Sequence, residues 1–129
     1  MALVILVTGG RRYARDGYVW QVLDAIHAAK GIKMIVHGAT PTRLGADWAA
    51  DDWSKFHGID RARFYVDHDL DGPWPAAGNR RNARMFAEMQ DVLGGIVAFP
   101  GGTGTAHMVA HARAQGFTKI MDLRGKGPP

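Results

Sequence analysis

Strand-length apolar runs alternate with segments of helical period along almost the whole chain, and this alternation limits the fold more than any other feature. The apolar runs extend over residues 3–7, 33–36, 63–66, 95–99 and 119–123. Several are apolar on both faces, as is typical of central parallel strands that helices cover on each side. The pattern predicts a Rossmann-like α/β fold, a doubly wound parallel sheet of about five strands in three αβα layers.

The segments between these runs repeat their apolar residues at helical spacing. Helices are predicted around residues 19–26, 46–53, 82–89 and 106–113. Asp16, Asn79 and Thr103 stand where N-caps are expected, and Gly31 and Gly58 stand where helices should end. In the last helix, Ala106, Val109, Ala110 and Arg113 are expected to share one face.

The chain has 129 residues, which suits one domain. We expect that domain to span residues 1–123, with a flexible tail at residues 124–129. No apolar run approaches the roughly 20 residues that cross a bilayer, and the first run does not resemble a signal peptide. The chain contains no cysteine, so neither disulfides nor thiolate chemistry is available. We expect a cytoplasmic protein that does not bind membranes.

The charge pattern indicates a compact anionic ligand. The formal net charge is +4 and the isoelectric point is about 9.8. Arginines gather in two clusters, at residues 11–15 and 80–84, and both lie beside Gly or Asn turns. A nucleic-acid duplex would require a longer basic face, so a phosphorylated small molecule fits better and nucleic acid is the less favoured partner.

The most informative loop follows the fourth apolar run and precedes a helix. It consists of Pro100, Gly101, Gly102, Thr103, Gly104 and Thr105. Glycine allows a ligand to approach the backbone, and the free N–H groups of a helix N-terminus attract phosphate. We expect this loop to bind a phosphate; the alternative is a tight strand-to-helix turn without a ligand.

A second glycine-rich loop follows the first strand. We expect Thr8, Gly9, Gly10 and Arg11 to contact phosphate or ribose; the alternative is that the arginines of this loop are solvated. The third glycine of the dinucleotide fingerprint and the P-loop lysine are both missing, which argues against a standard NAD site and a Walker ATPase. No cofactor is predicted. After the second strand, Asp47 begins a helix and is interpreted either as a cap or as a ligand of ribose hydroxyls.

These pieces together resemble the YspA-like, YpsA-related SLOG family over nearly the whole chain. The resemblance is carried by residues 7–13, 37–39 with 45–47, 76–85 and 98–105. SLOG domains are Rossmann-like modules that include the Lonely guy phosphoribohydrolases, which release a base from a nucleoside monophosphate, and sensors of nucleotide-derived signals. The Pro-Gly-Gly-x-Gly-Thr block at residues 100–105 is the hallmark of the superfamily.

The resemblance implies roles for individual residues. Residues 101–105 would hold a phosphate, and Arg81 would face the ribose or its leaving group. Gly38, Ala39, Asn82 and Met85 join the ligand-binding set. Relatives of the Lonely guy type pair through helices beside the site, so a homodimer or higher homo-oligomer is expected.

One departure from the Lonely guy pattern favours binding over hydrolysis. Those enzymes carry a glutamate three positions after the hallmark block, whereas this chain has Ala106, His107 and Met108 there. Asp47, or Asp67 and Asp69 in the loop after the third strand, could supply a replacement carboxylate.

Three functional hypotheses follow. The first is a domain that senses or sequesters a nucleotide, nucleoside monophosphate or ADP-ribose-like ligand. The second is a nucleotide N-glycosidase in which Arg81 and Asp47 are catalytic, and the third is single-stranded nucleic-acid binding.

A histidine pair and two tryptophans are further candidates for functional residues. His107 and His111 are four residues apart on a predicted helix, but no third ligand lies nearby in the sequence, so no metal site is predicted. Trp53 is expected in the core. Trp74 lies in a Pro-rich loop and is interpreted either as a base-stacking residue or as part of a lid.

Overall fold

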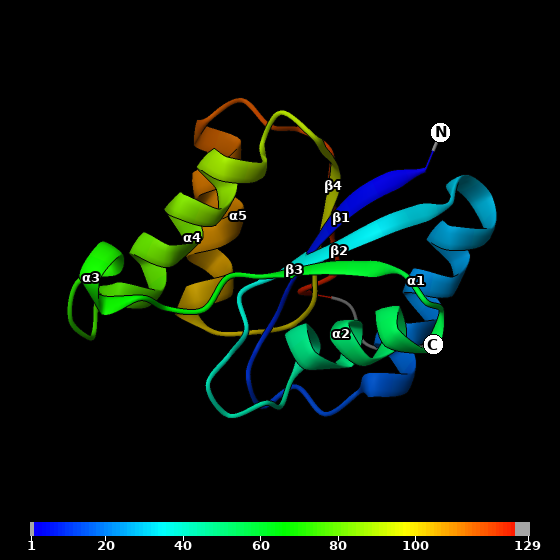
Figure 1. The fold of residues 1–129 in the computed structure, drawn as a ribbon, viewed down its shortest axis with the longest axis horizontal. Coiled ribbons are helices and arrows are strands. Elements are labelled where there is room, and N and C mark those ends of the chain that lie inside the picture. Colours follow the sequence, from blue (N-terminus) through cyan, green and yellow to red (C-terminus); the bar gives the residue numbers. More distant parts are fainter. Residues whose placement is uncertain (1, 126–129) are drawn as a thin grey trace.

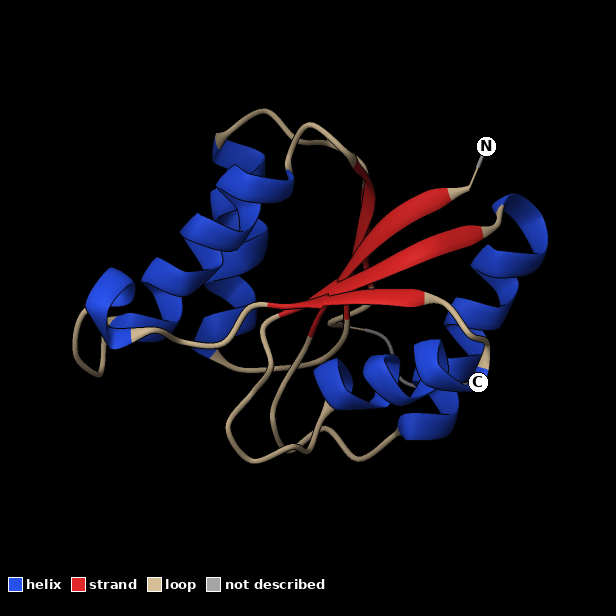
Figure 2. Ribbon diagram, in the orientation of Figure 1, coloured by secondary structure: helices blue, strands red, loops and turns tan. Residues whose placement is uncertain are grey.

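The computed structural model describes residues 2–125 and contains one parallel sheet. The sheet has the strand order β3-β2-β1-β4-β5. The strands are β1 (Leu3–Thr8), β2 (Ile32–His37), β3 (Asp60–Arg63), β4 (Leu93–Ala98) and β5 (Ile120–Asp122). Every pairing between neighbouring strands is parallel. The predicted Rossmann-like α/β fold is confirmed (Figure 2).

The helices cover both faces of this sheet. They are α1 (Asp16–Lys30), α2 (Ala46–Phe56), α3 (His68–Asp71), α4 (Ala77–Met89) and α5 (Thr103–Ala114). Figure 1 shows α1 and α2 on one side of the strands and α4 with α5 on the other. The three layers follow directly from the alternation of strands and helices in the sequence.

Each face of the sheet has its own hydrophobic core. Ile5 and Val7 of β1 pack with α1 and α2, where Trp53 is fully buried as expected. Val4 and Leu6 pack toward α4 and α5. Because successive side chains of a strand point to opposite faces, the central strand β1 supplies both cores.

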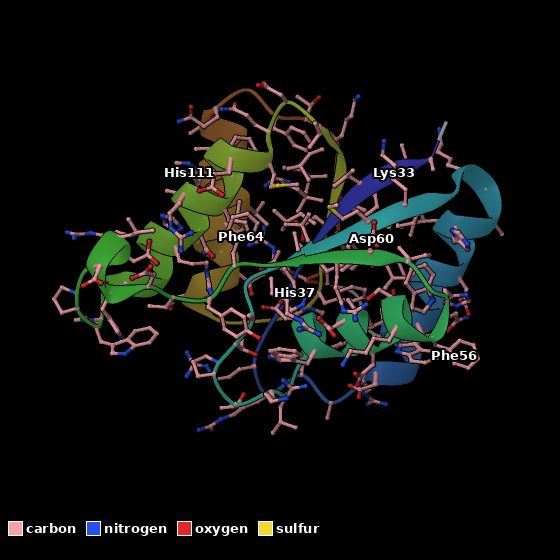
Figure 3. The ribbon with its side chains drawn as sticks, viewed as in Figure 1. Lys33, His37, Phe56, Asp60, Phe64 and His111 are labelled. Atoms are coloured by element: carbon pink, nitrogen blue, oxygen red, sulfur yellow. The ribbon has the colours of Figure 1, made fainter. Side chains whose placement is uncertain are left out.

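The third strand differs from its prediction. The apolar run at residues 63–66 indicated the strand, but β3 covers Asp60–Arg63 and the chain leaves the sheet at Phe64. β3 pairs only with β2 and is therefore an edge strand, which does not need apolar residues on both faces. Phe64 instead packs against the core beneath α4 and α5 (Figure 3).

The predicted helix caps are wrong by one to three residues. Asp16 and Thr103 are the first residues of α1 and α5, and Asn79 lies inside the first turn of α4. None of these three helices has a side-chain cap hydrogen bond. Gly31 does end α1, with φ of 76°.

The face predicted for α5 is also wrong. Ala106, Ala110 and Arg113 are exposed, and Val109 is the one member of the predicted set that is buried. The face that packs on the sheet consists of Thr105, Met108, Val109 and Ala112. Alanine is small enough to lie on either side of a helix, so its spacing alone did not identify the buried face.

None of the helices within residues 2–125 is both long and apolar enough to cross a membrane.

The first residue of the predicted tail makes contacts in the structure. Arg124 donates hydrogen bonds to the Asp122 carboxylate, at 2.9 and 2.7 Å. Residues 126–129 of the predicted tail lie outside the described residues.

Candidate functional site

The candidate site lies where the chain reverses its direction of travel across the sheet. From the central strand β1, the chain moves outward through β2 and β3 and then returns to the other side of β1 as β4. The loops after β1 and β4 therefore leave neighbouring strands toward opposite faces, which opens a crevice at their carboxyl ends. The N–H of Gly10 donates to the Pro100 carbonyl at 2.9 Å, so the two glycine-rich loops meet directly.

A cleft of about 800 Å³ opens at this edge of the sheet. The residues predicted from sequence that line it are Thr8, Gly9, Gly10, Arg11, Gly38, Asp47, Arg81, Asn82, Met85, Pro100, Gly101, Gly102, Thr103, Gly104 and Thr105. Ala39 is buried and does not line the cleft. The structure thus brings together residues from the loops after β1, β2 and β4 and from α4.

The glycines of the two loops divide into two groups. A Cβ at Gly9 would lie 2.5 Å from the Ala46 Cβ, and a Cβ at Gly101 would lie 2.6 Å from the Gly10 nitrogen. These glycines are needed because the loops pack against each other and against α2. A Cβ at Gly102 or Gly104 would meet nothing within 4 Å. Within the described protein, the surface of these two glycines is left open.

The open glycines coincide with the N-terminus of α5. Gly102 occupies the cap position, and within residues 2–125 this helix has no side-chain cap hydrogen bond. The first N–H groups of a helix lack intrahelical partners and carry a partial positive charge. The Asn82 side chain donates to the Gly104 carbonyl at 3.0 Å and fixes this loop to α4. The loop therefore presents backbone donors to the cleft in a fixed geometry.

Arg81 is held at the ends of two strands. Its Nη1 donates to the carbonyls of Gly38 and, at 3.2 Å, of Phe64, and its Nε donates to Asn82 Oδ1 at 3.1 Å. Burial lowers the pKa of Arg81, while the carboxylates of Asp47 and Asp71 act to raise it. Arginine stays charged under these conditions because its ordinary pKa is so high. The guanidinium is thus a fixed positive charge in the cleft, and it also braces the loops after β2 and β3.

Asp47 is the acidic residue among those that line the cleft in the described chain. Its side chain does not cap α2, whose cap position is Gly45, so the cap interpretation is wrong. The Asp47 carboxyl instead accepts hydrogen bonds from the backbone N–H groups of Gly38 and Thr40 in the loop after β2. Burial raises its pKa to about 7, although the Arg81 charge and both hydrogen bonds oppose this change.

A buried polar network supports the loop after β2, and the sequence did not reveal it. His37 Nδ1 accepts a hydrogen bond from the Ala39 N–H at 3.0 Å, so Nε2 carries the proton and donates to Asp51 Oδ2 at 2.7 Å. Arg63 binds both oxygens of the Asp51 carboxylate, at 2.7 and 3.0 Å. His37 lies between the end of β2 and α2 (Figure 3).

The network also fixes the charges beneath the loop. Burial opposes ionisation of Asp51, but the hydrogen bonds from Arg63 and His37 prevail and hold its pKa well below the usual range. Burial lowers the pKa of His37. Asp51 lies one helical turn after Asp47, and this pair of carboxyls on a buried helix face was the signal available in the sequence.

The other carboxylates considered from sequence lie elsewhere. Asp67 and Asp69 are exposed and do not line the cleft, and Asp67 caps α3 by accepting a hydrogen bond from the Asp69 N–H at 3.0 Å. Met108, at the position of the Lonely guy glutamate, is fully buried in the core. Asp47 is therefore the one carboxyl of those considered that the fold places in the cleft.

Trp74, interpreted from the sequence either as a base-stacking residue or as part of a lid, lines the cleft. Further lining residues were not assigned to binding from the sequence. They are Val7, Arg12, Tyr13, Thr40, Pro41, Val66, Pro75, Gly78 and Asn79. The hydroxyl of Tyr13 is buried and has no hydrogen-bond partner within residues 2–125. On α5, the rings of His107 and His111 stack with centroids 5.7 Å apart. Residues 2–125 contain no group of three or more His, Cys, Asp or Glu that would hold a metal ion.

Comparison with known families agrees with this architecture. The model of the YspA, cpYpsA-related SLOG family matches residues 3–70. The chain belongs to this SLOG family. The match runs from β1 to α3, so it includes the loops after β1 and β2 together with Asp47, and ends before α4 and the loop at residues 100–105. No curated protein gives a significant match. Membership of the SLOG family supports a nucleotide-related function in general.

The buried Asp47 of this SLOG domain predicts a specific pH dependence of stability. The folded-state pKa of about 7 lies above the ordinary value of 3.8, so the native state binds more protons than the unfolded state between these values. The natural protein should therefore lose stability as the pH rises from about 4 to about 7. Asp47→Asn keeps an acceptor for the backbone N–H groups and should escape this loss. Relative to the natural protein, it should gain up to about 4 kcal/mol across this range.

The measurement is the free energy of unfolding in denaturant from pH 4.5 to pH 8.5 for both proteins. Asp52→Asn is the control: it removes a negative charge from an exposed carboxylate on the same helix. It shows how much the loss of a charge from α2 changes the free energy of unfolding when the carboxylate is not buried. A difference between Asp47→Asn and the natural protein that stays constant over this pH range would contradict the assignment.

Proposed function

We propose that the cleft binds a nucleotide-like ligand, a nucleoside monophosphate or an ADP-ribose-like molecule, with a phosphate at the N-terminus of α5. The observation that carries the proposal is the open surface of Gly102 and Gly104 at an uncapped helix start. A phosphate there would accept hydrogen bonds from backbone N–H groups and would meet the positive end of the helix. The loop after β1, which contacts Pro100, would close the other side of the phosphate.

The charges of the cleft support an anionic ligand. Arg11 and Arg12 are exposed at its rim and Arg81 is fixed inside. Asp47, the acidic residue that lines the cleft within residues 2–125, has a pKa of about 7 and is therefore only partly ionised near neutral pH. Arginine and phosphate form strong, often bidentate hydrogen bonds. The volume of about 800 Å³ falls in the range of small-molecule sites and exceeds what a phosphate alone requires.

Binding can be tested at Gly104 without disturbing the fold. Gly104→Ala adds a methyl group where the protein leaves space, and alanine favours a helix over glycine by about 1 kcal/mol. The variant should be at least as stable as the natural protein but should bind AMP and ADP-ribose at least tenfold more weakly. Isothermal titration calorimetry gives the affinities, and thermal unfolding gives the stability.

Gly17→Ala is the matched control. Gly17 is the second residue of α1, as Gly104 is of α5, its added methyl also meets nothing, and it does not line the cleft. It should bind both ligands like the natural protein. Equal affinities for the two variants, or no binding by the natural protein, would contradict the phosphate site.

A second function is favoured by the position of Asp47. A carboxyl with a pKa of about 7 can accept a proton near neutral pH, which suits a general base. In N-glycoside hydrolysis, water adds to C1′ of the ribose, the bond from C1′ to the base breaks, and the base leaves with a proton. Ionised Asp47 would stabilise the positive charge that develops on the ribose and take one proton of the water, whose oxygen bonds to C1′. The leaving base would take a proton from solvent, and the proton that Asp47 then releases to solvent completes the balance.

Hydrolysis is tested on the same titration mixtures. Chromatography should detect free adenine after incubation with AMP, and Asp47→Asn should still bind AMP but release no adenine. If the natural protein leaves AMP intact, the hydrolase hypothesis is wrong and the protein is a binding domain. Equal adenine release by Asp47→Asn and the natural protein would exclude Asp47 as the base.

A further inference from the structure

Trp74 differs from the other tryptophans of the chain. It is 50% exposed and lines the cleft. The indole N–H groups of Trp20, Trp48 and Trp53 donate to Ala49 O, Thr40 O and Asp24 Oδ1, at 2.9, 2.7 and 2.8 Å. The indole N–H of Trp74 has no partner within residues 2–125. A large apolar ring that is left exposed in a cleft is suited to contact a ligand.

The position of the Trp74 ring is restrained by its neighbours. Pro73 and Pro75 flank it and limit the backbone. The ring of His68 meets it nearly edge-on, with centroids 5.5 Å apart and an interplanar angle of 76°. His68 is itself tied to the Gly72 carbonyl, with its Nδ1 2.7 Å away. Less side-chain entropy is therefore lost when a ligand binds to this ring.

Trp74 and the proposed phosphate site are connected through α4. A Cβ at Gly78, in the first turn of α4, would lie 3.8 Å from the Trp74 ring. Asn82, one helical turn further along, donates to the Gly104 carbonyl at 3.0 Å. Figure 1 shows α3 and the loop that follows it extending to one end of the molecule, beside α4. A phosphate at the start of α5 alone would leave the part of the cleft beside Trp74 unfilled.

The chemical character of the lining changes between the start of α5 and Trp74. Backbone donors and glycines dominate near β4, and Asp47 and Arg81 lie at the loop after β2. Around Trp74, the lining includes the apolar Val66 and Pro75 together with Gly78 and Asn79 of the first turn of α4. A ligand with a phosphate, a sugar and a flat apolar group in that order would match this sequence of surfaces.

We propose that Trp74 is a specificity-determining residue that stacks on the nucleobase of the ligand, so that the cleft selects nucleoside phosphates over sugar phosphates. The proposal rests on the phosphate site described above. Every base has a π-face, and stacking on an aromatic side chain contributes to affinity for any of them.

The experiment compares AMP with ribose 5-phosphate, which carries the same phosphate and sugar without a base. The natural protein should bind AMP at least about tenfold more tightly, a difference of ~1.4 kcal/mol. Trp74→Ala should lower the affinity for AMP to that for ribose 5-phosphate and leave the latter unchanged. Trp74→Phe, which keeps an aromatic face, should retain most of the preference.

Phe56→Ala is the control for loss of an exposed aromatic ring. Phe56 is 74% exposed at the end of α2 and does not line the cleft (Figure 3). It should leave both affinities unchanged. Equal affinities of the natural protein for AMP and ribose 5-phosphate would overturn the stacking proposal but keep the phosphate site. A Trp74→Ala variant that still prefers AMP would do the same, whereas no binding of either compound would overturn both.

Discussion

The close approach of backbones at the carboxyl edge of the sheet is the constraint on which the cleft depends. Gly45 has a φ of 90°, and a Cβ there would lie 2.7 Å from the Arg11 Cα. Gly10 in turn donates to the Pro100 carbonyl. Three loops and the start of α2 are thus packed with almost no side chain between them. The loop at residues 100–105 is held by its contact with Gly10, while the start of α5 at Gly102 and Gly104 stays open toward the cleft.

The polar side chains of α2 complete this arrangement. Asp51 anchors His37, which holds the left-handed Ala39 by its backbone N–H. Asp47 accepts from the N–H groups on either side of Ala39. Buried ionisable groups are costly unless they are hydrogen-bonded, so their presence indicates that the loop after β2 must keep one shape. The Arg81 guanidinium donates to the Gly38 carbonyl of the same loop and adds a fixed positive charge to the cleft.

The sequence predicted the parts of the structure that depend on local pattern. The central strands are apolar on both faces and the glycine-rich loops follow them directly, so the fold and most of the lining residues could be identified. The edge strand β3 and the network of His37, Asp51 and Arg63 depend on contacts between distant segments, which spacing does not encode. Family matching extends to residue 70, whereas the sequence-based resemblance extends along nearly the whole chain. Self-association and cytoplasmic location stay predictions.

Phosphate binding at the start of α5 is tested most directly by the change in backbone amide NMR signals on titration with AMP. The largest shifts are expected at the N–H groups of residues 102–105, together with shifts at Gly9, Gly10 and Arg11 in the loop after β1. Amides of β5 and of the C-terminal half of α1 should stay in place. Shifts that spare residues 102–105, or that map to a surface away from the cleft, would contradict phosphate binding at the start of α5.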